Sequence, residues 1–150
     1  MLRNWRYPVK VVHRGPAFGV KDALHPNGHR GTDYNGFPEG EPLFAVCDGM
    51  TVVLNKGVKD SKVLGNVIVL QVGSRFFGYC HLKVKSPLAI GQVVNHTDIV
   101  GHAGNTGSAS AGVHLHLTLS DTAEGVFNGK VEDADAFLTA QIATEKKAKK

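Results

Sequence analysis

Residues 113–119 constrain this chain more than any other stretch. Apolar residues occupy the odd positions, while the even positions hold His114, His116 and Thr118. Strict alternation of this kind predicts a β-strand with one buried face. Because alternate residues of a strand share a face, the two imidazoles lie side by side. Such a pair is either surface decoration or part of a metal or catalytic site, and the rest of the chain decides between them.

Short apolar runs between turn residues fill much of the remaining sequence. With 18 glycines among 150 residues and no low-complexity block, the chain favours short strands over long helices. Strands are expected at residues 42–47, 50–54, 66–72, 76–82 and 113–119. Asp48-Gly49 is a turn signal that predicts a hairpin between the first two of these strands. Helical spacing of apolar residues at 133–144 predicts a C-terminal helix.

These patterns predict a single domain, because 150 residues suffice for one core. We expect the domain to span residues 1–145 and to be mainly β. Its antiparallel sheets would form an open barrel or sandwich, with glycine-rich loops around a cleft and one C-terminal helix. Residues 146–150 would form a basic tail.

The charge distribution and the N-terminus argue against nucleic-acid and membrane partners. The net charge is +4, but four of the last five residues are lysines, so the rest of the chain is nearly neutral. No run approaches the ~20 apolar residues that a membrane-spanning helix needs. No apolar segment follows the charges of residues 1–6, so we expect neither a signal peptide nor membrane insertion.

The strand expected at 76–82 carries a further histidine and one of the two cysteines. By alternation, Phe77, Tyr79 and His81 share one face, and Cys80 lies on the other. Cys47 and Cys80 both lie in apolar runs, which predicts buried thiols rather than a disulfide.

A glycine-flanked segment offers two more candidate ligands, His29 and Asp33. Pro26 and Gly28 disfavour a helix there, so both residues are expected in a loop or short strand. Catalytic zinc usually has three protein ligands from histidine and carboxylate and keeps a fourth position for water. His29, Asp33 and one strand histidine would make such an open set.

His25 is the alternative partner of His29. A His-x-x-x-His pair shares one face of a helix, but Pro26 and Gly28 lie between these two histidines. We therefore do not expect His25 to be a ligand.

The glycine-rich run at 104–112 lacks the lysine and hydroxyl residue of a phosphate-binding loop, and no βαβ pattern surrounds it. We interpret it as a mobile loop over a cleft.

Five short motifs occur in a fixed order along the chain. They are HRGTD at 29–33, AVCDG at 45–49, GYCHL at 78–82, GNTG at 104–107 and HLH at 114–116. In order and spacing they resemble the lysostaphin-type (LytM-like) zinc endopeptidases of peptidoglycan, over about residues 18–120. Each motif alone is a weak signal, and the set of five is a strong one.

The resemblance implies a role for each of five residues. His29, Asp33 and His116 would bind one Zn²⁺ per chain, and His81 and His114 would be catalytic histidines beside it. One of these two would act as general base and the other would stabilise the oxyanion, in an order that the sequence leaves open. The loop at 105–110 would form one wall of the substrate groove.

The implied activity is hydrolysis of peptide cross-links in bacterial peptidoglycan, by a monomeric enzyme. Without a leader or a separate wall-binding module, the chain is expected to be a phage endolysin that stays in the host cytoplasm until release. The main alternative is a non-catalytic module of the same fold that binds peptidoglycan or activates another hydrolase.

Overall fold

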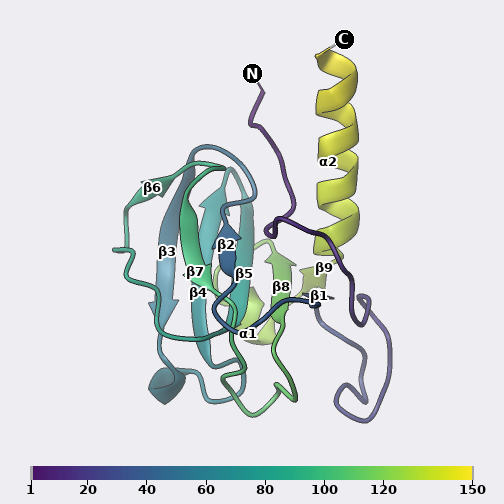
Figure 1. The fold of residues 1–150 in the computed structure, drawn as a ribbon, viewed down its shortest axis with the longest axis vertical. Coiled ribbons are helices and arrows are strands. Elements are labelled where there is room, and N and C mark those ends of the chain that lie inside the picture. Colours follow the sequence, from purple (N-terminus) through teal and green to yellow (C-terminus); the bar gives the residue numbers. More distant parts are fainter. Residues whose placement is uncertain (1, 150) are drawn as a thin grey trace.

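The computed structural model describes residues 2–149, and its largest element is a seven-stranded sheet (Figure 1). All strand pairings in this sheet are antiparallel. The order across it is β1 (Thr32–Tyr34), β8 (Leu115–Ser120), β5 (Arg75–Leu82), β4 (Asn66–Val72), β3 (Met50–Lys56) and β6 (Val93–Val94), and β9 (Val131–Glu132) pairs with β8. A second sheet pairs β2 (Pro42–Phe44) with β7 (Ile99–His102).

Three helical segments complete the fold. They are the 3-10 turn η1 (Val58–Asp60), the short helix α1 (Gly125–Asn128) and the C-terminal helix α2 (Ala134–Ala148). The predicted fold class, mainly β with antiparallel sheets and a long C-terminal helix, is confirmed. Among residues 2–149, no helix combines the length and the apolar character needed to cross a bilayer.

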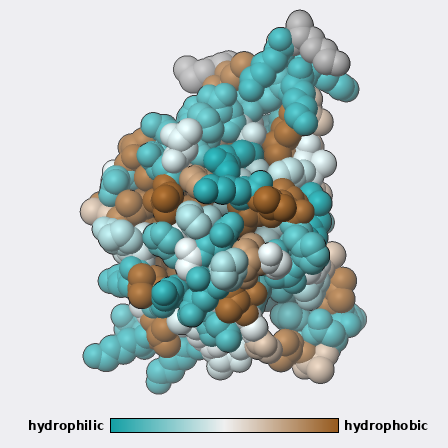
Figure 2. Space-filling view, viewed as in Figure 1, coloured by the Kyte–Doolittle hydropathy of each residue, from teal (hydrophilic) through white to brown (hydrophobic). Residues whose placement is uncertain are grey.

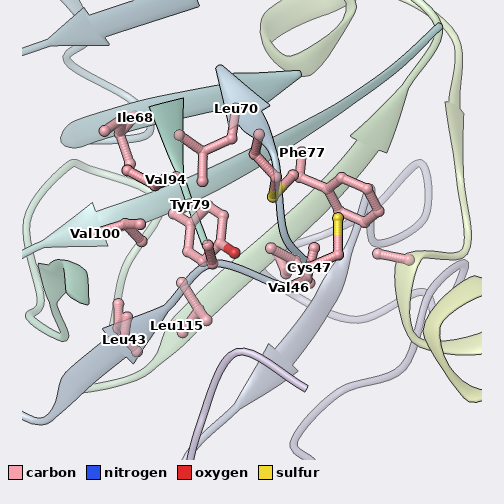
Figure 3. Close-up of a cluster of buried hydrophobic side chains, with 14 of the residues drawn as sticks. Leu43, Val46, Cys47, Ile68, Leu70, Phe77, Tyr79, Val94, Val100 and Leu115 are labelled. Carbon is pink, nitrogen blue, oxygen red and sulfur yellow. The ribbon is translucent and has the colours of Figure 1, made fainter. Parts of the chain in front are cut away.

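The apolar half of the alternating stretch forms the centre of the main core. Leu115, Leu117 and Leu119 of β8 are completely buried. On the neighbouring strand, Tyr79 pairs with Leu117 and Phe77 with Leu119. Figure 3 shows Phe77, Tyr79 and Leu115 packed with residues of the second sheet, which covers this face of the large sheet. Burial of each such side chain is worth about 1.5–3 kcal/mol, so the main core fixes which way β8 faces.

The opposite face of the large sheet carries the polar half of the same stretch. A smaller apolar cluster lies here, formed by Val67, Val69, Cys80 and Val126. Gly78 allows α1 to approach the sheet, because a Cβ at that position would overlap the side chain of Val126. Cys47 and Cys80 are both buried, free thiols, as predicted.

The predicted hairpin between 42–47 and 50–54 is wrong. β2 pairs with β7 and β3 pairs with β4 and β6, so the two segments belong to different sheets. Between them, residues 45–47 cross the core and are completely buried. Their backbone partners lie in other segments: Arg6 N–H donates to the Val46 carbonyl at 2.8 Å, and Ala45 N–H donates to the Asp98 carbonyl at 3.3 Å. The Asp48-Gly49 turn therefore redirects the chain without pairing its two sides.

Helix α2 begins where the sequence predicts and ends later. Asp133 caps its N-terminus by accepting a hydrogen bond from Ala136 N–H at 3.0 Å. The predicted helix ends at 144, but α2 continues to Ala148, so Lys146 and Lys147 lie in its last turn instead of a free tail. Basic residues there favour the negative end of the helix dipole. Much of the surface at the far end of this helix is hydrophilic (Figure 2).

Glu145 joins α2 to the N-terminal segment. Its carboxylate accepts backbone hydrogen bonds from Arg3 at 2.6 Å, Asn4 at 3.2 Å and Trp5 at 2.6 Å. Asn4 has a left-handed backbone, φ 56°, which turns three successive N–H groups toward one anion. Burial acts to raise the pKa of Glu145, but these donors outweigh it and hold that pKa below its ordinary value.

Replacing Glu145 by glutamine should loosen this junction in a pH-dependent way. At pH 7, Glu145→Gln should lower the free energy of unfolding by about 1–2 kcal/mol, because charged acceptors bind N–H groups more strongly. A carboxylate with a lowered folded-state pKa stabilises the fold above its unfolded pKa and loses that effect as the pH falls. The difference between the two proteins should therefore shrink below about pH 4.5. Denaturant unfolding of both proteins at pH 7 and below about pH 4.5 measures this difference in stability. The exposed Glu39→Gln variant is the control, and an equal loss in both variants would contradict this role.

Candidate active site

The pairing of β1 with β8 brings together three residues that are distant in sequence. Asp33 lies directly opposite His116 in the antiparallel register, and His29 lies three residues before the start of β1. His29 Nε2 is 3.0 Å from His116 Nδ1 and 3.0 Å from Asp33 Oδ1, and His116 Nδ1 is 3.2 Å from the same oxygen. All three side chains are buried.

This trio of His29, Asp33 and His116 fits a metal ion. Ligands of a tetrahedral zinc ion with bonds of about 2.0–2.1 Å are about 3.3 Å apart, close to the separations of these atoms. His29 Nδ1 lies 3.2 Å from the carbonyl oxygen of Ala17. Since a carbonyl only accepts, Nδ1 carries the proton and the lone pair of Nε2 faces the trio.

The charges of the trio suit a cation as well. Burial alone would raise the pKa of Asp33, but the imidazoles of His116 and His29 beside it outweigh burial and hold that pKa far below its usual range. Burial lowers the pKa of His116. An ionised carboxylate beside imidazole nitrogens is a donor set that zinc accepts.

His114 and His81 lie next to the trio, each held through Nδ1 by a backbone carbonyl. His114 Nδ1 donates to Gly112 at 2.7 Å, and His81 Nδ1 donates to Thr106 at 2.7 Å. The two ring centroids are 4.8 Å apart. His114 Nε2 is 3.7 Å from Asp33 Oδ2. In both rings, the bond to the carbonyl leaves Nε2 free for the exchange of a proton.

The pKa of His81 is lowered to about 4, mainly by burial and to a smaller extent by the nearby His114. The ring of His81 is therefore neutral near pH 7. A neutral imidazole with a free Nε2 can accept a proton from a reacting group.

The predicted face of His81 is wrong. Alternation placed it with Tyr79 on the core side, yet its ring centroid lies 5.9 Å from that of His116. His81 has a left-handed backbone, φ 63°, which breaks the alternation of β5 at this residue. Such a conformation is rare for a side chain with a Cβ and is typical of functional sites.

Cys80 was expected to lie away from the metal, on the opposite face. It pairs directly with His116 and therefore lies on the same face of the sheet. Burial raises the pKa of its thiol well above the ordinary value, so Cys80 stays protonated. A thiol ligates a metal as the thiolate, and Cys80 is not one of the three residues whose donor atoms converge.

Four of the five residues, Asp33, His81, His114 and His116, line a groove of about 740 Å³, and the buried His29 lies behind them. One wall comes from residues 22–28, and the other from residues 61–64 and 109–114. The wall expected from the loop at 105–110 is formed mainly by residues after it, since Ala109 is the one residue of that loop among the lining residues. The first half of the glycine-rich run has a different role. Gly107, with φ 89°, packs against the backbone of residues 63–65, which fixes the Thr106 carbonyl that holds His81.

His25 lines this groove and contacts the trio without being part of it. Its ring centroid is 4.3 Å from that of His29. His25 is not among the three residues whose donor atoms converge, and no pattern in the sequence predicted its contact with His29. The carbonyls of Ala17, Thr106 and Gly112 were also not foreseen, because a backbone carbonyl has no signal in the sequence.

Comparison with known proteins agrees with this geometry. The model of peptidase family M23 matches residues 27–131. The peptidoglycan DD-endopeptidase ShyA of Vibrio cholerae is 33% identical over 120 residues, which are 76% of this chain and 26% of that protein. The chain therefore spans about a quarter of the length of this relative.

Solved structures share the fold. The catalytic domain of lysostaphin from Staphylococcus simulans has a TM-score of 0.71 and 25% identity, covering 85% of this chain and 92% of that domain. A zinc-containing peptidase from Vibrio cholerae has a TM-score of 0.67 and 27% identity, covering 78% of this chain and 36% of that one.

Removing one imidazole of the trio should abolish metal binding. We expect His116→Ala to weaken the affinity for Zn²⁺ by at least about 100-fold. Loss of a residue that only hydrogen-bonds to a metal ligand weakens binding by about 10- to 100-fold, and loss of a ligand itself should weaken it more. Metal analysis after dialysis and titration with a chelating dye measure this. The control is His13→Ala, an exposed histidine bonded to Asn35. Wild-type metal content in His116→Ala would show that the trio is not a metal site.

Gly31 should be required for the shape of the trio. A Cβ at this position would lie 2.5 Å from the Leu117 carbonyl oxygen and 2.7 Å from His116 Nε2. Gly31→Ala should therefore displace His116, lowering the stability by about 1–3 kcal/mol and weakening metal binding.

Gly57→Ala is the matched control, because a Cβ there meets nothing closer than 3.7 Å. Unfolding curves and the metal titration test both variants. Equal behaviour of the two would disprove the close approach at Gly31.

Proposed function

Because the chain belongs to peptidase family M23, we propose that it is a zinc-dependent endopeptidase that hydrolyses peptide cross-links of bacterial peptidoglycan. The observation that carries the proposal is the buried trio of His29, Asp33 and His116 at the groove, with two further imidazoles beside it. The trio would hold Zn²⁺, and His81 and His114 would be the catalytic histidines.

The substrate class rests on the relatives. ShyA is named a peptidoglycan DD-endopeptidase, and lysostaphin is described as an antimicrobial peptidase. The groove, at about 740 Å³, has room for a stretch of peptide. Peptidoglycan peptides are therefore the proposed partners, bound by a monomeric enzyme.

The two histidines beside the trio would have different roles in the reaction. When bound, zinc supplies a Lewis acid and lowers the pKa of water at the site. Nε2 of one histidine, His81 or His114, accepts the proton of the attacking water and returns it to the leaving amine. The other donates a hydrogen bond to the oxyanion of the tetrahedral intermediate. Because the Thr106 and Gly112 carbonyls accept from Nδ1 of both rings, Nε2 takes up the proton in the neutral ring and donates the hydrogen bond from the ring that is protonated.

Separating metal binding from catalysis tests the proposal. His81→Ala should keep its zinc and lose activity by about 10²- to 10⁴-fold, because it removes a proton-transfer group and no ligand. Metal analysis and the turbidity of a cell-wall suspension, with and without a zinc chelator, are the measurements. Hydrolysis at the normal rate by His81→Ala would contradict its role. A wild-type protein that binds cell walls but holds no zinc and causes no lysis would favour a non-catalytic binding module.

An origin as a phage endolysin stays a prediction. The gene neighbourhood tests it, since an adjacent holin gene would support it and an adjacent cell-division gene would count against it.

A further inference from the structure

Asp22 and His25 form a hydrogen-bonded pair on one wall of the groove. Asp22 Oδ1 is 2.9 Å from His25 Nδ1. The His25 side chain keeps 19% of its surface exposed, and both residues line the groove. The pair lies next to His29. His81 and His114 contact each other at the opposite end of the trio, near Asp33 and His116.

The local backbone holds this pair in place. Asp22 Oδ1 also accepts hydrogen bonds from the backbone N–H groups of Leu24 at 3.0 Å and His25 at 2.8 Å, so one carboxylate organises the whole turn. Gly28, with φ 101°, then returns the chain so that His29 N–H reaches the Val20 carbonyl at 2.8 Å. The position of His25 relative to His29 is thus fixed before any ligand binds.

The carboxylate also determines what His25 can recognise. Ionised Asp22 only accepts hydrogen bonds, so the Nδ1 of a neutral His25 carries the proton. Its Nε2 then has an unshared lone pair and is an acceptor. Peptides present many N–H donors, from backbone amides and from amino groups of side chains.

We propose that His25 is a substrate-binding residue whose Nε2 accepts a hydrogen bond from an N–H group of the peptide in the groove. This inference rests on the proposed function and adds a contact on the side of the trio away from the catalytic histidines. Asp22 would act as a positioning residue that fixes the tautomer of His25. The competing explanation is that the His25 ring only shields His29 from solvent.

His25→Phe separates these explanations, because it keeps a ring against His29 and removes both nitrogens. The substrate would be soluble cross-linked peptides released from purified peptidoglycan by a muramidase. Loss of one hydrogen bond should raise KM about five- to ten-fold and leave kcat and zinc content near wild type. An unchanged KM with normal zinc content would overturn the proposal and assign His25 to shielding.

His96→Phe is the matched control. His96 Nδ1 is 2.6 Å from Asp48 Oδ1, the same kind of pair, but it lies in a different surface hollow. We expect this variant to leave KM unchanged.

A binding measurement makes the test independent of turnover. In a His81→Ala background, isothermal titration calorimetry with the same peptides measures affinity directly. Adding His25→Phe should weaken binding by the same five- to ten-fold factor. If the wild-type chain fails to cleave the peptides, the proposed function fails, and this comparison still decides the role of His25. Weaker binding supports the contact, and equal binding overturns it.

Discussion

The register between β1 and β8 is the constraint on which the site depends. It places Asp33 opposite His116, and a slip of one residue would turn Asp33 into the main core. Tyr34, the next residue, prevents that slip. Its ring is completely buried on the core face, and its hydroxyl donates to Asp135 at 2.7 Å. One short strand thus carries a core anchor and the carboxylate of the trio on adjacent residues.

The imidazoles around this carboxylate are oriented by the backbone. Three of them donate through Nδ1 to carbonyls, those of Ala17, Thr106 and Gly112. Each carbonyl lies in a segment between regular elements, yet each is tied down by hydrogen bonds of its neighbours, such as Ser108 N–H to the Lys62 carbonyl at 2.9 Å. Ring orientation therefore does not depend on the ion, which is the preorganisation that catalytic sites require.

How far the site could be predicted depends on whether its residues obey a repeating pattern. Alternation correctly predicted that His114 and His116 share a face, because the buried leucines at 115, 117 and 119 fix the other face of β8. The same rule failed for His81, since a single left-handed residue has no signature in the period of a strand. Likewise, Asp48-Gly49 was recognised as a turn, but its strands found partners elsewhere in the sequence. The contact between His25 and His29 was missed because it arises in a loop without any period.

The junction at Glu145 has a consequence for how the domain can be joined to other chains. It ties the N-terminal segment to the last turns of α2, and both ends leave the molecule on the same side (Figure 1). The loops that border the groove lie at the other end. A polypeptide fused to either end would start well away from the groove entrance, so the substrate path would stay open. This arrangement is compatible with further chain at either end, and in the Vibrio cholerae relative the matched stretch makes up only 26% of the protein.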